Sequence, residues 1–206
     1  MTNADQNTYL LHQAAILADQ FKPRAADFDR ARKLDQDASD AMAEAGFYRL
    51  FVPEHLGGLE ASPVVSAQIF ERLAQGSAAC GWVAFIAATS GSTLGSIPEE
   101  TARAIFSHPN TMVAGVFAPS GQASVDAGQV TVNGRWQWGS GTQNADWVLG
   151  GCLVDSGGET SSQHMVLMPT SEIQFLDTWH VSGLQGTGST DYEAVDLSLS
   201  DGHIVG

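Results

Sequence analysis

The chain has 206 residues, of which 43% are hydrophobic, and a formal net charge of −14 at pH 7. This length can form one large domain or two small ones. The sequence has no cationic stripe to neutralise phosphates, which argues against nucleic-acid binding and against binding to a membrane surface.

The charge is unevenly distributed. Residues 104–206 contain ten acidic side chains and one basic side chain, Arg135, which gives a net charge of −9. This shortage of cations weighs against a phosphate-rich ligand docking mainly on the second half. Backbone N–H groups can still hold a phosphate without a side-chain charge.

The cysteines and the N-terminus bear on the compartment. Cys80 and Cys152 lie far apart and outside any Cys-x-x-Cys pattern, so we expect two buried thiols in a reducing cytoplasm and neither a disulfide nor a zinc site. The N-terminus is polar, with no basic stretch before an apolar core, so no signal peptide is expected. The longest apolar run, residues 78–88, is shorter than the roughly 20 residues that span a bilayer. We therefore expect a soluble, cytoplasmic protein with no membrane contact.

The first hundred residues have helical patterns. Apolar residues recur at three- and four-residue steps over 10–21 and again over 34–45, and Gly46 stands where a glycine commonly ends a helix. Ser62-Pro63 predicts the start of a third helix, because serine caps N-termini and proline suits the first turn. This helix is expected to end at Gly76.

Two further helices are predicted before residue 110. Residues 78–88 are apolar all round, which is typical of a central, buried helix. Pro98 begins a fifth predicted helix, which ends near His108-Pro109.

After Pro109 the pattern changes to short segments rich in β-forming residues, separated by Gly, Ser and Asp. The predicted strands are 112–117, 129–132, 135–139, 147–154, 164–169, 173–176 and 194–199. They indicate an antiparallel β-sandwich or barrel, and the polar stretch 156–162 is expected to be a solvated loop. A helical block followed by a β block defines the α+β class, with an N-terminal α-helical domain at 1–110 and a middle β domain at 111–206.

One predicted hairpin carries the strongest functional signal. Asn133-Gly134 is typical of a two-residue turn, because both turn residues need positive φ. In the strand that follows, alternation places Trp136 and Trp138 on one face, with Ser140 next on that face. A flat apolar wall beside a hydroxyl suits a planar, polar-edged ring such as an isoalloxazine. A sandwich core that contains tryptophans is the alternative on spacing alone.

Four segments, in order along the chain, resemble the acyl-CoA dehydrogenase superfamily. Residues 46–59 resemble its Val-Pro-Glu loop between N-terminal helices, and residues 115–121 stand where its first flavin strand ends in Thr-Glu-Pro. Residues 133–147 resemble its flavin-contacting strand, and residues 179–191 its glycine-rich segment. The resemblance covers nearly the whole chain.

The resemblance implies a set of flavin-contacting residues. The serines would hydrogen-bond the flavin edge and N5, the tryptophan would pack against the ring, and glycine would let the backbone approach closely. These candidate cofactor-binding residues are Phe117, Ser120, Trp138, Ser140 and Gly141. For Ser120 the alternative is a turn residue that caps its own backbone.

The departures from the dehydrogenases point to another branch. Ala118-Pro119-Ser120 replaces Thr-Glu-Pro, and the phrases at 138–141 and 145–148 resemble the flavin-dependent monooxygenases. That branch includes two-component enzymes that take reduced FMN or FAD from a separate reductase. The resemblance also implies an enclosed, dry pocket that protects a reactive oxygenated flavin.

The substrate pocket and the catalytic group are less defined. Several oxygenases of this branch carry a histidine on the buried fourth helix, but residues 87–92 contain none. Trp82, Thr89 and Ser90 are candidates for lining the substrate pocket, although neither hydroxyl is a base at neutral pH and Trp82 also fits a core position. No two histidines have the i, i+4 spacing of helical metal ligands, so no metal site is expected. The catalytic residue is left unassigned.

The family also has a C-terminal four-helix bundle that completes the flavin site and forms most of the oligomer. No segment here corresponds to it, so we expect a truncated form, a core or half of a split enzyme, in which the catalytic residue lies in the missing part. The leading hypothesis is a two-component flavin-dependent monooxygenase of a small hydrophobic or aromatic substrate, with a flavin reductase as partner and a homo-oligomer when full length. One alternative is an acyl-CoA dehydrogenase that performs FAD-dependent α,β-desaturation. Another is a non-catalytic or split homologue that binds a partner chain through an exposed apolar sheet face.

Overall fold

The computed structural model describes residues 3–155, 157 and 161–205. Part of the predicted polar loop, residues 156 and 158–160, therefore lies outside the described residues. The helices are α1 (Asn3–Phe21), α2 (Ala25–Ala31), α3 (Gln36–Glu44), α4 (Pro63–Gly76), α5 (Ala78–Ser92) and α6 (Glu99–Ile105). The strands are β1 (Val113–Asp126), β2 (Gln129–Gly139), β3 (Trp147–Asp155), β4 (Ser162–Pro169), β5 (Gln174–Leu176), β6 (Thr190–Ser200) and β7 (Ile204–Val205).

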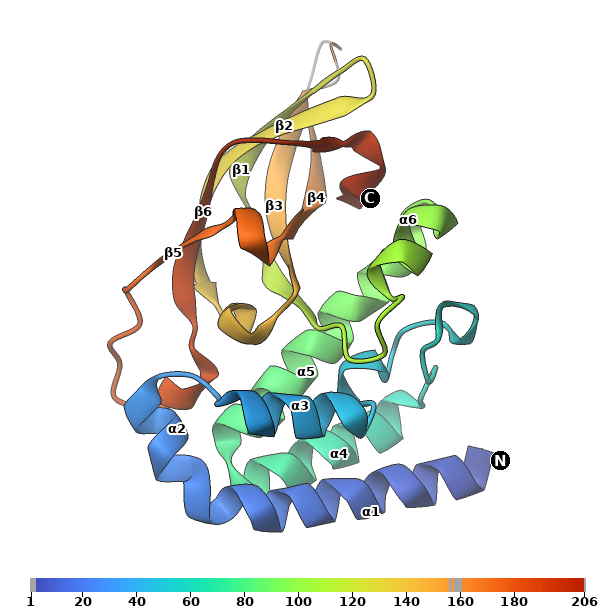
Figure 1. The fold of residues 1–206 in the computed structure, drawn as a ribbon, viewed down its shortest axis with the longest axis vertical. Coiled ribbons are helices and arrows are strands. Elements are labelled where there is room, and N and C mark those ends of the chain that lie inside the picture. The colour runs from blue at the N-terminus through green and yellow to red at the C-terminus, as the bar shows by residue number, and fades with distance from the viewer. Residues whose placement is uncertain (1–2, 156, 158–160, 206) are drawn as a thin grey trace.

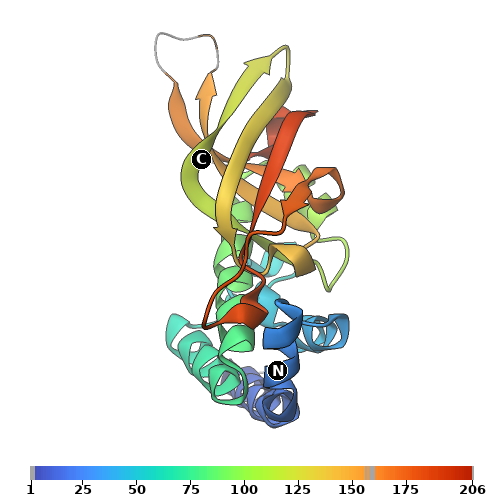
Figure 2. The same cartoon turned by 90° about the vertical axis from the view of Figure 1, so that its left-hand side faces the viewer.

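The helices gather at one end of the molecule and the sheet stands on them, which confirms the α+β class (Figure 1). The view turned by 90° shows the sheet above the helices again, with α5 running up into the junction (Figure 2). The helical core includes Phe21, Phe28, Met42 and Leu73, and it continues into Met112 at the start of the β part. The two parts therefore share a hydrophobic core where they meet.

Local capping explains where several helices begin and end. Ser62 precedes α4, and its Oγ accepts a hydrogen bond from the N–H of Val64 at 3.3 Å, so the predicted start at Pro63 is confirmed. Asp35 caps α3 by accepting from the N–H of Ala38 at 2.9 Å. Gly46 follows α3 with φ +81°, the left-handed conformation expected of a glycine past a helix end.

The helix α2 was not predicted from the sequence. This helix has only seven residues and one buried side chain, Phe28, so it presents no apolar periodicity. Its position comes from the edge-to-face contact of Phe28 with Phe21, whose ring centroids are 6.1 Å apart.

The central helix is longer than predicted. α5 continues through a 3₁₀ turn to form an apolar segment, Ala78–Ser96, of 19 residues. Its length and composition alone would suffice to cross a membrane, but 56% of the most apolar stretch is buried inside the protein. A buried core helix meets the same criteria, so this segment does not by itself indicate a membrane.

The strand order is β5-β6-β2-β1-β3-β4-β7 in one seven-stranded sheet of the described chain. The pairs are antiparallel except β1 and β3, which run parallel from Val113 opposite Trp147. The expectation of a purely antiparallel sheet is corrected at this pair. The reason is that β2 pairs with one edge of β1, and the segment 140–146 then crosses to the other edge, where β3 begins.

The prediction of a two-residue turn at Asn133-Gly134 is wrong. Both residues lie inside β2, and the turn between β1 and β2 is made by Ala127 and Gly128, whose φ angles are +49° and +83°. Gly134 is needed for close packing, because a Cβ there would lie 2.6 Å from the Cα of Gly121.

Asn133 supports a bulge in the neighbouring strand. Its Nδ2 donates to Oδ1 of Asp196 at 3.0 Å, and its Oδ1 accepts from the N–H of Asp196 at 2.8 Å. Asp196 has φ +48°, and the β2–β6 register shifts beside it. Asn133 thus stabilises a bulge in β6, which explains why the Asn-Gly pair occurs here without forming the predicted turn.

Trp136 is the centre of the β core. Its side chain is fully buried, stacks on Tyr192 at 5.3 Å between ring centroids, and donates from Nε1 to the carbonyl of Gly151 at 2.8 Å. Glycines on three strands make room for the indole, since a Cβ at any of them would overlap it: Gly121, Gly134 and Gly150.

Candidate functional site

Trp138 does not share a face with Trp136, which corrects the alternation expected from the sequence. Between the pairs Trp136–Tyr192 and Gly139–Thr190 the β2–β6 register shifts, so β2 carries one extra residue. Trp138 lies in this bulge with φ +63°, and its side chain is 70% exposed. A bulge of this kind re-aims a side chain. One tryptophan therefore fills the core and the other stands on the surface.

A buried carboxylate holds the bulge in place. Oδ1 of Asp191 accepts from the N–H of Trp138 at 3.4 Å, and Oδ2 accepts from Nη2 of Arg135 at 2.8 Å. Burial acts to raise the pKa of Asp191, but hydrogen bonds from Arg135, Thr178 and the Trp138 N–H outweigh it and hold the pKa below its ordinary value. Asp191 thus fixes the backbone that presents Trp138.

Ser140 belongs to a chain of hydrogen bonds that joins α5 to the β part. Nε1 of Trp82 donates to Oγ of Ser140 at 2.9 Å, and this Oγ lies 2.7 Å from Oγ of Ser189. The Ser189 Oγ lies 2.6 Å from Oγ1 of Thr187, which donates to the carbonyl of Leu184 at 2.9 Å. We call this the hydroxyl chain. Ser140 itself is 8% exposed.

Ser189 and Thr187 were missed as individual site residues. The surrounding segment 179–191 was identified only through its resemblance to the family's glycine-rich segment. The available signal was the density of hydroxyl side chains between glycines in Gly186-Thr187-Gly188-Ser189. Only the fold shows that Ser189 contacts Ser140, 49 residues away in sequence, and that Thr187 contacts Ser189 in turn.

Gly141 has a structural role. Its φ is +72°, its N–H donates to the carbonyl of Thr187 at 2.8 Å, and a Cβ would lie 2.9 Å from Cε of Met112. The turn after β2 therefore requires glycine whether or not a ligand approaches. Its predicted contact with a cofactor stays a prediction.

Phe117 and Ser120 lie on an irregular part of β1. The β1–β2 ladder ends at Gly121–Gly134, and the β1–β3 register shifts between Val116 and Gly121. Both side chains are exposed, and Phe117 is 48% exposed. Their role as flavin-contacting residues stays a prediction.

α5 presents an aromatic face beside Ser140. Trp82 and Phe85 are 43% and 37% exposed, with ring centroids 5.5 Å apart, and Phe85 in turn meets Phe70 of α4 at 5.6 Å. Trp82 is therefore partly exposed and not the core residue that the alternative assumed, and its place in a substrate pocket stays a prediction. Thr89 lies two turns further along the same face, with its hydroxyl tied to the carbonyl of Phe85 at 2.8 Å.

Ser90 points away from this face. It is fully buried, and its Oγ has no hydrogen-bond partner among the residues that the structure describes. The fold thus brings Trp82 and Ser140 together, places Thr89 on the same helix face and turns Ser90 inward. The Thr89 hydroxyl is bonded to the carbonyl of Phe85 and the Ser90 hydroxyl is buried, so neither predicted pocket hydroxyl is presented on this face as a proton-transfer group.

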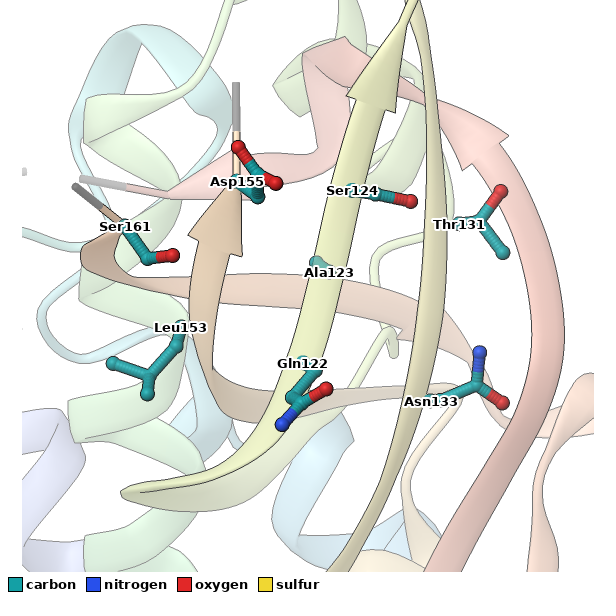
Figure 3. Close-up of a pocket in the computed structure, with 8 residues that line it drawn as sticks. All are labelled: Gln122, Ala123, Ser124, Thr131, Asn133, Leu153, Asp155 and Ser161. Atoms are coloured by element: carbon teal, nitrogen blue, oxygen red, sulfur yellow. The ribbon is translucent and has the colours of Figure 1, made fainter. Parts of the chain in front are cut away.

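Two hollows lie elsewhere. Figure 3 shows one on the outer face of β1, β2 and β3, lined by Gln122, Ala123, Ser124, Thr131, Asn133, Leu153, Asp155 and Ser161. The other lies between α3, the α6–β1 connection and the start of β3, and its lining includes Tyr48, His108 and Asp146. Neither is lined by a predicted site residue; the predicted residues Trp82 and Trp138 are instead exposed at the surface.

The metal-ligating and thiol groups of the described residues are the other possible reactive centres. Within residues 3–155, 157 and 161–205, no group of three or more His, Cys, Asp or Glu side chains is placed to hold a metal ion. Both cysteines are buried and unpaired. Burial raises the pKa of Cys80 and of Cys152 to about 12, which leaves them as unreactive thiols at neutral pH.

A helical block docked on a mixed sheet, with an aromatic face and a hydroxyl at the junction, has the architecture of acyl-CoA dehydrogenase-like flavoproteins. Comparison with known proteins agrees: residues 3–104 match the family model for the acyl-CoA dehydrogenase N-terminal domain. The chain belongs to the acyl-CoA dehydrogenase superfamily, as the four sequence segments predicted.

Its relatives carry monooxygenase names. Indole-3-acetate monooxygenase of Pseudomonas putida is 34% identical over 181 residues, which are 87% of this chain and 46% of the relative. The crystal structure of the HsaA monooxygenase from M. tuberculosis superposes with a TM-score of 0.88 at 28% identity, over 97% of this chain and 55% of that one. A structure of XiaF from Streptomyces in complex with FADH2 and glycerol gives the same TM-score at 24% identity, over 98% and 52%, and supports the fold. The chain spans about half the length of the relatives it matches.

Proposed function

We propose that this chain provides the helical and β parts of a two-component, flavin-dependent monooxygenase that acts on a small aromatic substrate. The observation that carries the proposal is the open aromatic face at the junction: Trp138 on its bulge, with Trp82 and Ser140 joined by a hydrogen bond. The names of the relatives favour oxygenation over desaturation.

The residues present fit the flavin ring better than its phosphates. Oγ of Ser140 already accepts a hydrogen bond from the N–H of a planar aromatic ring, the indole of Trp82. The only cation of residues 104–206, Arg135, is paired with Asp191 at 2.8 Å. Phosphate groups of FMN or FAD would therefore need backbone N–H groups, cations of the helical part or further protein surface.

Each residue has a role in this proposal. Reduced flavin, delivered by a separate reductase, would supply the electrons for oxygen chemistry. Ser140 would meet the polar edge of the ring, and Trp138 would pack against it. Trp82 and Phe85 would form the apolar wall for an aromatic substrate. Asp191 would hold the bulge, and the catalytic proton-transfer group is not among these residues.

The working site must also exclude water. Trp138 and Phe117 are 70% and 48% exposed, so the described face is not a dry pocket. We therefore propose that further protein surface covers this face in the active enzyme, as a homo-oligomer in the cytoplasm. The same exposed face would serve the alternative of a non-catalytic module that binds a partner chain.

Anaerobic titration of reduced and oxidised FMN and FAD into the purified chain, followed by mixing with air under spectroscopic recording, tests the proposal. Binding of reduced flavin and a long-lived oxygenated-flavin absorbance are expected. Tight retention of oxidised FAD that bleaches with an acyl-CoA would instead indicate a dehydrogenase. No flavin binding, together with a stable complex with another chain, would indicate the partner-binding module.

A matched pair of variants locates the site. Trp138→Ala and Val64→Ala each truncate an exposed apolar side chain, 70% and 68% exposed. Loss of ring contact should weaken flavin binding by about tenfold in Trp138→Ala. Val64 is the second residue of α4 and not part of β2, and Val64→Ala should bind flavin like wild type. Equal effects of both variants would place the flavin elsewhere.

A further inference from the structure

The hydroxyl chain has a fixed direction. An indole N–H can only donate and a carbonyl oxygen can only accept, so the two ends of the chain, at Trp82 and Leu184, are set. Each hydroxyl between them has one proton to give. If every proton is used, Trp82 donates to Ser140, Ser140 to Ser189, Ser189 to Thr187, and Thr187 to the carbonyl of Leu184.

The reverse direction is disfavoured. If Ser189 donated to Ser140, Thr187 would have to donate to Ser189, and its oxygen would face the carbonyl oxygen of Leu184 at 2.9 Å with no proton between them. The proton of Ser140 would then lack a partner in the described part of the chain. Leaving a buried polar group without its partner is unfavourable.

The forward direction makes Ser140 an acceptor toward any ligand. Its only proton is directed to Ser189, at 2.7 Å, while one of its two lone pairs already accepts from Trp82. A ligand that reaches Ser140 can therefore only donate a hydrogen bond, either to the remaining lone pair or in place of the indole.

This polarity discriminates between the redox states of a flavin. N5 of a reduced isoalloxazine carries a proton and donates, whereas N5 of the oxidised ring is an acceptor. We propose that Ser189 and Thr187 are positioning residues that give the site its preference for reduced flavin, by holding Ser140 as a hydrogen-bond acceptor. The proposal rests on the proposed function, because it assumes that a flavin edge meets Ser140.

The size of the effect follows from one hydrogen bond. Oxidised flavin would lose a bond that reduced flavin makes, and a net hydrogen bond corresponds to about tenfold in affinity. The dissociation constant for oxidised flavin should therefore exceed that for reduced flavin by about tenfold from this source. A tenfold ratio corresponds to about 30 mV in the potential of the bound two-electron couple.

Substitutions of Ser189 and Thr187 should abolish the preference, although neither side chain is proposed to contact the flavin. In Ser189→Ala the proton of Ser140 loses its acceptor and becomes free to donate to oxidised flavin, so the ratio of the two dissociation constants should fall about tenfold. Thr187→Val removes the acceptor for Ser189, which can then donate to Ser140, and it should have the same result. Thr142→Val is the matched control, because its buried hydroxyl donates to the carbonyl of Gly139 at 2.7 Å outside the hydroxyl chain.

The experiment measures both dissociation constants, anaerobically for reduced and aerobically for oxidised FMN and FAD, in the wild-type chain and these three variants. In the flavin-free protein, the NMR signal of the Trp82 indole N–H should shift in Ser140→Ala and stay in place in Ser189→Ala. This signal monitors both folding and the hydrogen bond from Trp82 to Ser140. An unchanged ratio in Ser189→Ala and Thr187→Val, or equal affinities in wild type, overturns the inference while the proposed function stands. Failure of wild type to bind either flavin overturns both.

Discussion

Trp136 is closely packed by glycines on neighbouring strands, and this packing supports a double-mutant test. A Cβ at Gly150 would lie 2.5 Å from Cε2 and 2.6 Å from Cζ2 of the indole. Real Cβ atoms do not approach so closely, and the indole cannot retreat because it is fully buried and stacked on Tyr192. Gly150→Ala should therefore destabilise the chain through overpacking, by about 1–3 kcal/mol.

Trp136→Phe should also destabilise, for a different reason. The shorter ring leaves a cavity of a few tens of Å³, which at about 24 cal/mol per Å³ amounts to roughly 1 kcal/mol. The carbonyl of Gly151 also loses the hydrogen bond from Nε1, which adds about 1 kcal/mol. The sum is roughly 2 kcal/mol.

The double variant Gly150→Ala/Trp136→Phe should be more stable than the sum of the two losses predicts. The benzyl ring lacks the outer atoms that the new methyl group would meet, so the methyl group fills part of the cavity. The coupling energy should be at least about 1 kcal/mol in the stabilising direction. Gly183→Ala is the control, because a Cβ there meets nothing within 4 Å, and it should be nearly neutral.

Urea unfolding followed by tryptophan fluorescence and circular dichroism measures these free energies. Additive losses within about 0.5 kcal/mol would refute the reasoning, since they would mean that Gly150 and Trp136 are energetically independent. A stable Gly150→Ala variant would refute it equally.

Three further outcomes follow from the charges and caps. The pKa of Asp191 is lowered in the folded chain, so its carboxylate contributes stability at pH values above the ordinary Asp pKa of about 4. This contribution is lost as the pH falls through the folded pKa. Asp191→Asn should therefore be less stable than wild type at pH 7, and urea unfolding should show the difference shrinking below about pH 4. Cys80 and Cys152, with pKa values raised to about 12, should react with a thiol reagent at pH 8 only after denaturant is added, and rapid reaction of the folded chain would contradict their burial. Asp35→Ala should lower the unfolding free energy by about 1 kcal/mol through loss of the α3 cap. Asp35→Asn keeps a capping oxygen and should lose less stability. Equal losses in the two variants would assign the effect to the ion pair of Asp35 with Arg24 at 2.5 Å.

Features that depend on neighbouring residues could be predicted from the sequence. The start of α4 at Pro63 was predicted from the adjacent Ser62. The end of α3 was predicted from Gly46, which adopts the left-handed conformation with φ +81°. The order of a helical block and a β block also follows from local periodicity. These signals are local because a helix satisfies its backbone and its caps within a few residues.

The sheet was only partly predictable. The segments that became β3, β4 and β5 were recognised, but the Asn133-Gly134 signal placed a turn inside β2. A turn signal reports what two residues tolerate, and here that tolerance serves close contact with Gly121 and a bulge opposite Asp196. The pairing of β1 with β3 depends on the path of the intervening chain, which no local pattern encodes.

The amino-acid sequence was thus sufficient for the class of fold, the family and the individual residues Trp82, Trp138 and Ser140 as site candidates. Tertiary structure alone decided what these residues do together. Ser140 meets Trp82 across 58 residues and Ser189 across 49, and Trp138 is turned to the surface by a bulge that the buried Asp191 holds. Such contacts join elements that are distant in sequence, and hydrogen-bond direction along a chain of hydroxyls is defined only when all its members are in place.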